Sequence, residues 1–132
     1  MALKSLISRA SDKASLALHG HSGMKVNELI HPGPDGSLHL HLLLDEVEPG
    51  GKIDAHYHEL TPAYDHGYYV ISGEILAHIG DKTEIVGADT LIYCASDVVH
   101  SIENVGKMPA KLLRIGAAAN GKTIGKLVVV KE

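Results

Sequence analysis

The sequence predicts an all-β fold in which many short strands close into a barrel or pack as a sandwich. From Met24 onward, short alternating or β-branched segments are separated by Gly, Pro, Asn and Asp. No segment with a helical period follows residue 20, and a chain of 132 residues is about one domain long. A barrel or sandwich is favoured because both arrangements hide the edges of the strands.

Ten segments are expected to be strands, and turn-forming residues separate them. Pro49-Gly50-Gly51 is expected to be one such turn, and Asn120-Gly121 another. The predicted strands are residues 24–30, 38–48, 53–58, 66–72, 74–79, 83–86, 90–94, 99–105, 111–115 and 126–130.

The first 23 residues are expected to form an arm or a short helix, and residues 24–132 a single β-barrel domain. Leu3, Leu6, Ile7, Ala10 and Ala14 lie at helical spacing. Phe and Trp are both absent, so the core of the barrel must be mainly aliphatic.

Composition excludes several classes of protein. With 45% hydrophobic and 21% charged residues the chain is typical of an ordered globular protein. A net charge of −4 without a basic stripe argues against nucleic acid as a partner. The longest apolar runs, at 42–44 and 127–130, are too short to span a membrane. Cys94 is the only cysteine, so no intrachain disulfide can form and the cytoplasm is the expected compartment.

Histidine is abundant, and its ten residues include three His-x-His triplets. Residues i and i+2 of a strand point to the same face, so two such imidazoles can reach one metal ion. The abundance of histidine does not show which triplet binds a metal. The three triplets are His19-Gly20-His21, His39-Leu40-His41 and His56-Tyr57-His58.

The surroundings of the third triplet distinguish it. Gly50 is followed by five residues and then His56 and His58, His66 precedes Gly73 by seven residues, and His100 precedes Asn104 by four. This combination of spacings resembles the two motifs of the cupin superfamily. The first motif runs glycine, five residues, His-x-His, a glutamate and a glycine; the second runs Pro-x-Gly-x-x-His-x-x-x-Asn. The resemblance covers residues 38–116.

The resemblance implies a cupin double-stranded β-helix, or jelly-roll barrel, with one divalent transition metal ion: manganese, iron, nickel, copper or zinc. The implied ligands are His56, His58, His66 and His100. His66 stands where the family has its glutamate, which makes the chain similar to small bacterial cupins with four histidine ligands. Two other departures are a longer span between His58 and His66 and Ala95-Ser96-Asp97 in place of Pro-x-Gly. Glu59, close to His58, is the alternative fourth ligand.

Four neutral imidazoles would leave the full +2 charge on the ion, which favours Lewis-acid chemistry on an anionic or enolisable substrate. Tyr68 shares the face of His66 and is the candidate catalytic residue, although it is equally well explained as part of the core.

The remaining candidates are assigned other roles. His39 and His41 share a face with Val47, but the neighbouring leucines define a competing apolar face, so their orientation stays open. Cys94 is expected to be a small buried apolar residue. Surface positions are expected for His19, His21, His31 and His78.

The function that follows is a metal-dependent enzyme, an oxygenase or dioxygenase acting on a small oxygenated or aromatic molecule. A metal-dependent isomerase or lyase is the close alternative. Non-catalytic binding of a small molecule or metal is another, as is a structural dimer with an idle pocket. We expect a homodimer, because residues 38–44, Tyr69, Ile71 and residues 127–130 offer outward-facing apolar side chains.

Overall fold

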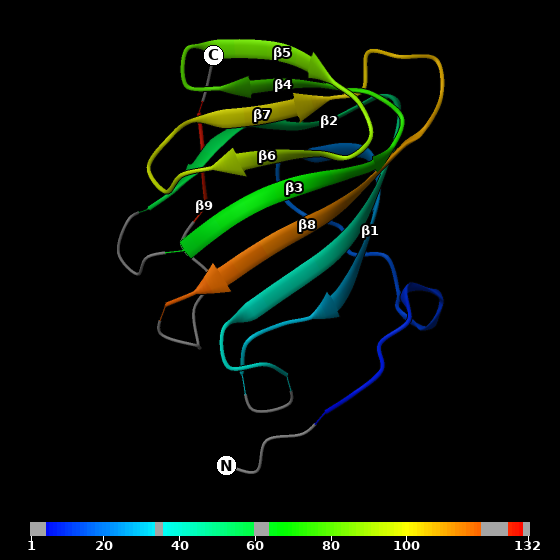
Figure 1. Ribbon diagram of the computed structural model, residues 1–132, viewed down its shortest axis with the longest axis vertical. Helices are drawn as coiled ribbons and strands as arrows, with labels where there is room; N and C mark the ends of the chain where they lie inside the picture. Colours follow the sequence, from blue (N-terminus) through cyan, green and yellow to red (C-terminus); the bar gives the residue numbers. More distant parts are fainter. Residues whose placement is uncertain (1–4, 34–35, 60–63, 120–126, 131–132) are drawn as a thin grey trace.

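The computed structural model describes residues 5–33, 36–59, 64–119 and 127–130. In these described residues, one short 3-10 helix, η1, precedes nine strands in chain order (Figure 1). The elements are η1 (Ala10–Asp12), β1 (His21–Ile30), β2 (Leu40–His58), β3 (Tyr64–Ser72), β4 (Ile75–Ile79), β5 (Lys82–Val86), β6 (Thr90–Cys94), β7 (His100–Glu103), β8 (Ala110–Ala118) and β9 (Leu127–Val129).

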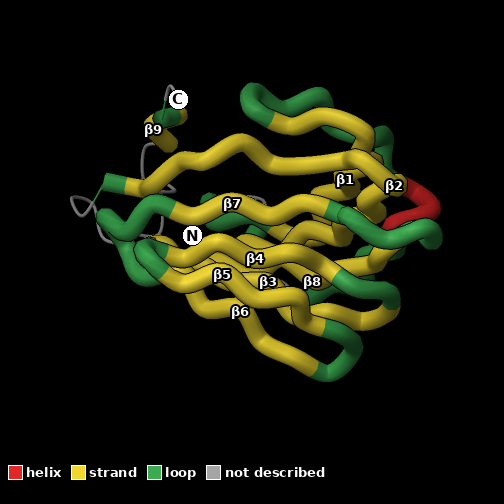
Figure 2. Tube along the Cα trace, turned by 90° about the horizontal axis from the view of Figure 1, so that it is seen from above, coloured by secondary structure: helices red, strands yellow, loops and turns green. Residues whose placement is uncertain are grey.

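The strands form one curved antiparallel sheet with the order β5-β4-β7-β2-β8-β3-β6. Strands β1 and β9 pair with β2 outside this path. Viewed from above, the strands wrap around a common axis (Figure 2). The all-β prediction is therefore confirmed, and the fold is a nearly closed barrel.

The longest strand, β2, corrects the prediction of two strands separated by a turn. Its first half pairs with β8 and with most of β1, and its second half pairs with β7, β9 and the first residues of β1. Pro49-Gly50-Gly51 bends the strand without ending it: Gly50 takes a φ of +83°, and a Cβ on Gly51 would overlap the carbonyl oxygen of Gly23. At Pro49-Gly50-Gly51 one edge of β2 passes from pairing with β8 to pairing with β7. The predicted turn at Asn120-Gly121 lies outside the described residues.

Alternation places one face of each long strand inside the barrel. On β8, Leu112, Arg114 and Gly116 are buried, and the residues between them are only partly buried. The apolar core lies toward the Ala110 end of β8 and is aliphatic apart from Tyr68 and Cys94. Its members are Val47, Ile53, Tyr68, Val70, Ile75, Ala77, Ile92, Cys94, Ile102, Ala110 and Leu112.

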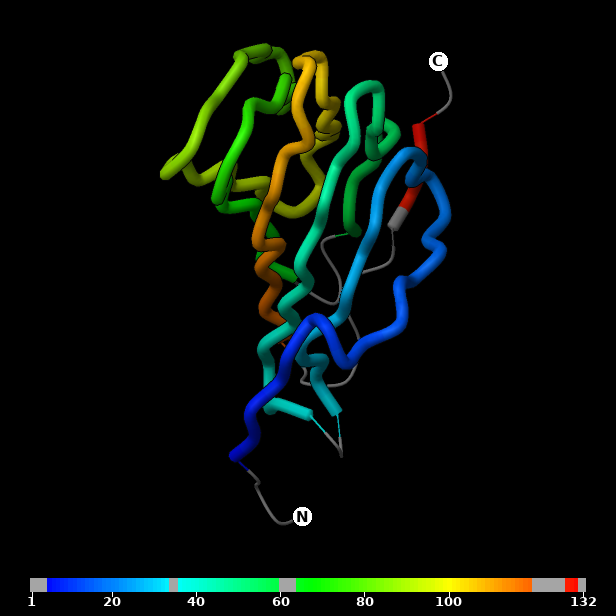
Figure 3. The backbone as a smooth tube through the Cα atoms, turned by 90° about the vertical axis from the view of Figure 1, so that its right-hand side faces the viewer, coloured from blue at the N-terminus to red at the C-terminus, as the bar shows by residue number. Residues whose placement is uncertain are grey.

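The described part of the N-terminal segment is an extended arm with one 3-10 turn, so the helical alternative is wrong for residues 5–20. The segment runs beside β1 (Figure 3). The Leu16 amide donates to the Val26 carbonyl at 2.7 Å, and the Asn27 side chain donates to the Lys13 carbonyl at 2.9 Å. These bonds to β1 satisfy backbone groups that a helix would have used internally.

Among the described residues, no helix has the length and apolar character needed to cross a bilayer.

Candidate metal centre

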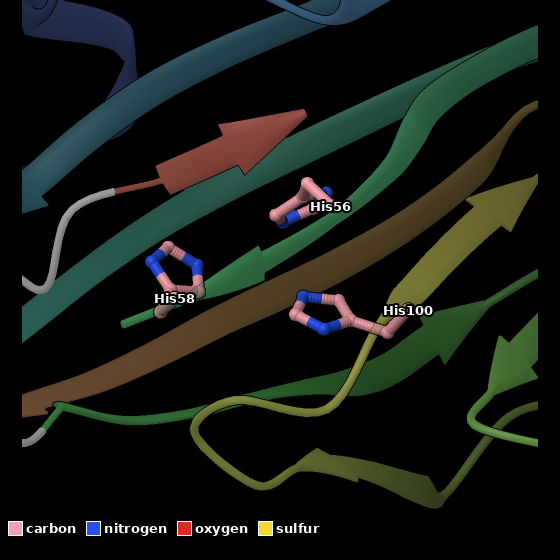
Figure 4. Close-up of side chains that lie close together, drawn as sticks. All are labelled: His56, His58 and His100. Atoms are coloured by element: carbon pink, nitrogen blue, oxygen red, sulfur yellow. The ribbon is translucent and has the colours of Figure 1, made fainter. Parts of the chain in front are cut away.

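Three strands bring the four predicted ligands together inside the barrel. His56 and His58 lie at the end of β2, His66 on β3, and His100 is the first residue of β7. His56 is the direct cross-strand partner of His100. All four side chains are buried, with 2–7% of each residue exposed. Figure 4 shows the imidazoles of His56, His58 and His100 gathered between β2 and β7.

The rings of His56, His58 and His100 form one group of candidate ligands, and the His66 ring lies beside that of His58. Ring centroids are 4.2 Å apart for His56 and His100, 5.4 Å for His56 and His58, and 4.8 Å for His58 and His66. The ligand atoms of His56, His58 and His100 lie within 4.8 Å of one another. Ligand atoms bound tetrahedrally at ~2.1 Å lie about 3.4 Å apart, so side-chain rotations of up to roughly 1.4 Å would bring these three atoms onto one ion.

Backbone hydrogen bonds orient two of these rings. Nδ1–H of His56 donates to the Asp54 carbonyl at 2.7 Å, and Nδ1–H of His100 donates to the Val98 carbonyl at 3.0 Å. In this tautomer Nε2 of each ring carries the free lone pair, as in metal-binding histidines held by a carbonyl. Nε2 of His100 and Nδ1 of His66 are buried without a hydrogen-bond partner among the described residues. The donors therefore fit a divalent ion that accepts nitrogen lone pairs.

Burial keeps the imidazoles of His56, His66 and His100 neutral. Together with the neighbouring His100, it lowers the pKa of His56 to about 3. Burial lowers the pKa of His100 to about 4, and burial with the Arg114 charge lowers the pKa of His66 well below its usual value. Neutral imidazole is the ligating form, so metal binding does not first have to remove a proton near neutral pH.

His66 is placed differently from the other three histidines. Its ring is 6.5 Å from that of His56, and its ligand atom is grouped with those of Cys94 and His100. Glu59, the alternative fourth ligand, belongs to no cluster of three or more candidate ligand atoms in the part of the chain that the structure describes.

Tyr68 lies beneath the histidines. It is fully buried, and its ring centroid is 4.9 Å from that of His66. Its hydroxyl has no hydrogen-bond partner among the described residues, and burial raises its pKa. The Arg114 guanidinium lies 5.5 Å from the centre of the ring, a cation–π distance. Tyr68 is thus adjacent to the candidate site and also part of the core.

A hydrogen-bonded chain that the sequence did not reveal runs from the surface to the cluster. Nε2–H of His41 donates to the Glu28 carboxylate at 2.7 Å, and the Tyr64 hydroxyl donates to Nδ1 of His41 at 2.9 Å. Burial lowers the pKa of His41, which favours this neutral tautomer. The Tyr64 ring lies 5.1 Å from that of His58. The sequence did not show whether His41 or the neighbouring leucines face the interior. In the structure the His41 side chain is buried inside the barrel.

A buried ion pair was also missed. Arg114 on β8 donates through Nε and Nη2 to the two oxygens of Asp45 on β2, at 2.9 and 3.0 Å. Nη1 of Arg114 lies 3.0 Å from Nε2 of His21. Burial alone would lower the pKa of Arg114, but the Asp45 carboxylate outweighs it and raises the pKa. The expectation that His21 is a surface residue is wrong, because it reaches inward to this pair.

Other predicted residues have structural roles or lie outside the site. His19, His31, His39 and His78 are exposed. Asn104, the last residue of the second motif, donates to the carbonyls of Val47 and Met108 and accepts from the Gly106 amide. Cys94 is buried, which raises its pKa to about 12 and agrees with an inert thiol in the metal-free protein.

Comparison with known proteins supports the fold and the motifs. A family model described as a cupin domain matches residues 43–116. The tetracenomycin polyketide synthase protein TcmJ of Streptomyces glaucescens is 25% identical over 100 residues, which are 76% of this chain. The match spans 65% of that relative, slightly less than two thirds of its length.

Two solved structures share the architecture. The polyketide cyclase RemF of Streptomyces resistomycificus superposes with a TM-score of 0.76 at 22% identity, covering 99% of this chain and 87% of that one. A Thermotoga maritima protein described as a predicted oxalate decarboxylase gives a TM-score of 0.71 at 21% identity, covering 86% and 99% of the two chains. The predicted double-stranded β-helix is confirmed.

Proposed function

Because the chain belongs to the cupin family, we propose that it is a metal-dependent enzyme acting on a small oxygenated or aromatic molecule. One divalent transition metal ion is held by His56, His58, His66 and His100. The observation that carries this proposal is the burial of four imidazoles beside one another, three of which burial keeps neutral. Nitrogens of His66 and His100 lack any hydrogen-bond partner among the described residues. Such nitrogens are costly to bury unless a ligand uses them.

The donor set limits the chemistry. Imidazole suits zinc, copper, iron and nickel, and the family resemblance adds manganese. When bound by neutral ligands the ion keeps its +2 charge and polarises an oxygen atom of a substrate. The barrel walls supply the dry surroundings in which that polarisation is strong.

Tyr64 is suited to position the substrate. Its hydroxyl proton is directed to His41, whose other nitrogen donates to Glu28. The Tyr64 oxygen therefore presents lone pairs on its remaining side, which can accept a hydrogen bond from a hydroxyl group. The position of this ring beside His58 and His66 supports a role close to the ion.

Two reaction types are candidates. The dioxygen-dependent reaction expected from the resemblance needs open coordination positions beside the imidazoles. A cyclase-like or lyase-like reaction without dioxygen is favoured by the names of similar proteins, which are a polyketide synthase protein, a polyketide cyclase and a predicted oxalate decarboxylase. Polyketides and oxalate are both carbonyl compounds, which a Lewis acid activates in the same way.

Metal analysis tests the site. The purified protein should carry about one divalent ion per chain, and His56→Ala and His100→Ala should lose most of it. His19→Ala replaces an exposed histidine and serves as the matched control. Unchanged metal content in both ligand variants would rule out this assignment.

Turnover tests the reaction. The metal-loaded protein would be incubated with polycarbonyl, phenolic and dicarboxylic compounds, with and without dioxygen, and products followed by mass spectrometry. A product formed only with dioxygen identifies the oxygenase, and one formed equally without it identifies the cyclase or lyase. Saturable binding without any product would identify a non-catalytic binding protein and refute the enzyme proposal.

The expected compartment of the protein is the cytoplasm.

A further inference from the structure

Cys94 is the inward-facing last residue of β6 and lies against the candidate metal centre. It is the cross-strand partner of His66 in the pairing of β3 with β6, and only 1% of the residue is exposed. Neighbouring residues of a cross-strand pair project to the same face of a sheet. Sγ of Cys94 and the ligand atoms of His66 and His100 all lie within 4.8 Å of one another.

The two histidines of this group independently point to a ligand. Nδ1 of His66 and Nε2 of His100 are buried and have no hydrogen-bond partner among the described residues, and these residues are 4% and 2% exposed. Val98 already holds the other nitrogen of His100, so Nε2 is the nitrogen left to bind. The cysteine therefore belongs to a cluster whose nitrogens lack a partner, and not only to the apolar core.

We propose that Cys94 is a further metal ligand, whose thiolate binds the ion on the side of His66 and His100. This inference rests on the proposed function and extends its donor set from nitrogen alone to nitrogen and sulfur. As the ion binds, a metal–sulfur bond replaces the S–H bond, the thiol proton passes to solvent, and no electron is transferred.

A sulfur donor changes which metals the site prefers. Thiolate is a soft ligand that favours zinc and copper, whereas manganese favours oxygen donors. In tetrahedral coordination, Zn–S bonds of about 2.3 Å and Zn–N bonds of about 2.0–2.1 Å place the ligand atoms about 3.4–3.6 Å apart. The separations in this cluster are at most 4.8 Å, so side-chain rotations of up to roughly 1.4 Å would bring the three atoms onto one ion.

Cobalt(II) spectroscopy tests the assignment directly. Titration of the metal-free protein with cobalt(II) chloride should give visible d–d bands and, in the near ultraviolet, a thiolate-to-cobalt charge-transfer band. Cys94→Ser is similar in size and should keep the d–d bands while losing the charge-transfer band. Cys94→Ala, which adds no hydroxyl to the core, should behave in the same way, and His19→Ala should match the unmodified protein.

Chelator competition gives a second measurement. Loss of a supporting residue behind a ligand commonly weakens metal affinity ten- to a hundredfold, so loss of a ligand should cost at least as much. We expect Cys94→Ser to weaken zinc binding by roughly a hundredfold and to weaken manganese binding much less.

The outcomes separate the two proposals. Cobalt d–d bands without a charge-transfer band in the unmodified protein would overturn the role of Cys94 and leave the histidine site intact. A charge-transfer band that persists in Cys94→Ser would also overturn it. No cobalt binding at all would refute both this inference and the proposed metal centre.

Discussion

At the scale of single residues, the candidate site depends on which nitrogen of each imidazole carries the proton. Asp54 and Val98 fix this for His56 and His100 through backbone carbonyls two residues earlier in the chain. For His41 the acceptor is a side chain, the carboxylate of Glu28 on the neighbouring strand. The local backbone thus prepares lone pairs for a ligand before any ion is present.

Stability of the metal-free protein should depend on pH because of these buried histidines. In the folded state the pKa of His56 is about 3 and that of His100 about 4, against ~6.5 in an unfolded chain. Both pKa values are lowered, so below ~6.5 the unfolded state binds more protons and the free energy of unfolding falls as pH falls. Each histidine contributes up to about 1.4 kcal/mol per pH unit. Urea denaturation after chelation, at several pH values between about 7 and 5, would measure the slope.

Two variants test whether buried histidines cause this dependence of the free energy of unfolding on pH: His56→Gln and, as a control, His19→Ala. The first should make the pH dependence shallower, and the second should leave it unchanged because His19 is exposed. A free energy of unfolding that stays constant over this range would contradict the prediction.

The identity of the fourth ligand can be tested by substituting His66 and Glu59 separately. His66→Ala should weaken metal binding, and Glu59→Ala should leave it normal. His66→Glu should keep a filled site, because a carboxylate occupies this position in the family motif, and its negative charge should lower the reduction potential of a bound redox metal. Chelator competition would rank the affinities. A large loss in Glu59→Ala with none in His66→Ala would reverse the assignment.

At the scale of elements, close packing between strands positions the side chains of the site. Gly116 on β8 is the cross-strand partner of both His41 and His66. The Tyr64 hydroxyl lies directly over Gly116. A Cβ atom on Gly116 would overlap the Tyr64 oxygen. The absence of a side chain on β8 therefore lets Tyr64 reach His41.

Gly116→Ala should disrupt this contact. The added methyl group displaces the Tyr64 ring, and overpacking of this kind typically costs about 1–3 kcal/mol of stability. Urea denaturation would measure the loss, which should be smaller when Tyr64→Leu is already present. Gly87→Ala is the control, since its nearest non-neighbouring atom is 4.0 Å from the built Cβ. Equal losses in the two single variants would show that Tyr64 does not depend on Gly116.

At the scale of the whole molecule, the outer surface of the barrel carries exposed apolar side chains. On the neighbouring strands β3 and β6, Ile71, Leu91 and Tyr93 are 41%, 58% and 52% exposed. Leu40, on the outer side of β2, is 49% exposed. Apolar patches of this kind commonly mark contact surfaces.

We propose that two copies of the chain associate through such a surface as a symmetric dimer. Light scattering at micromolar concentration should give twice the chain mass of 14.0 kDa. Leu91→Lys should shift the mass toward that of the single chain, whereas Ser72→Lys, at another exposed position, should not. A mass near 14.0 kDa for the unmodified protein would exclude the dimer.

The all-β barrel, the family and the inward position of His56, His58, His66 and His100 could be predicted from the order of residues alone. Alternation along a strand and the spacing of motif residues are local properties, so they can be read from neighbouring positions in the chain. The local signal was insufficient at Pro49-Gly50-Gly51, because the same residues form a turn or a bend according to which strands lie beside them.

The residues that surround the histidines could not be predicted in this way, because they come from distant parts of the chain. Glu28, His41 and Tyr64 lie on three different strands, and Arg114 is 69 positions from Asp45. Cys94 meets His66 only because β6 pairs with β3. Contacts of this kind depend on strand order and register, which pair residues far apart in the chain.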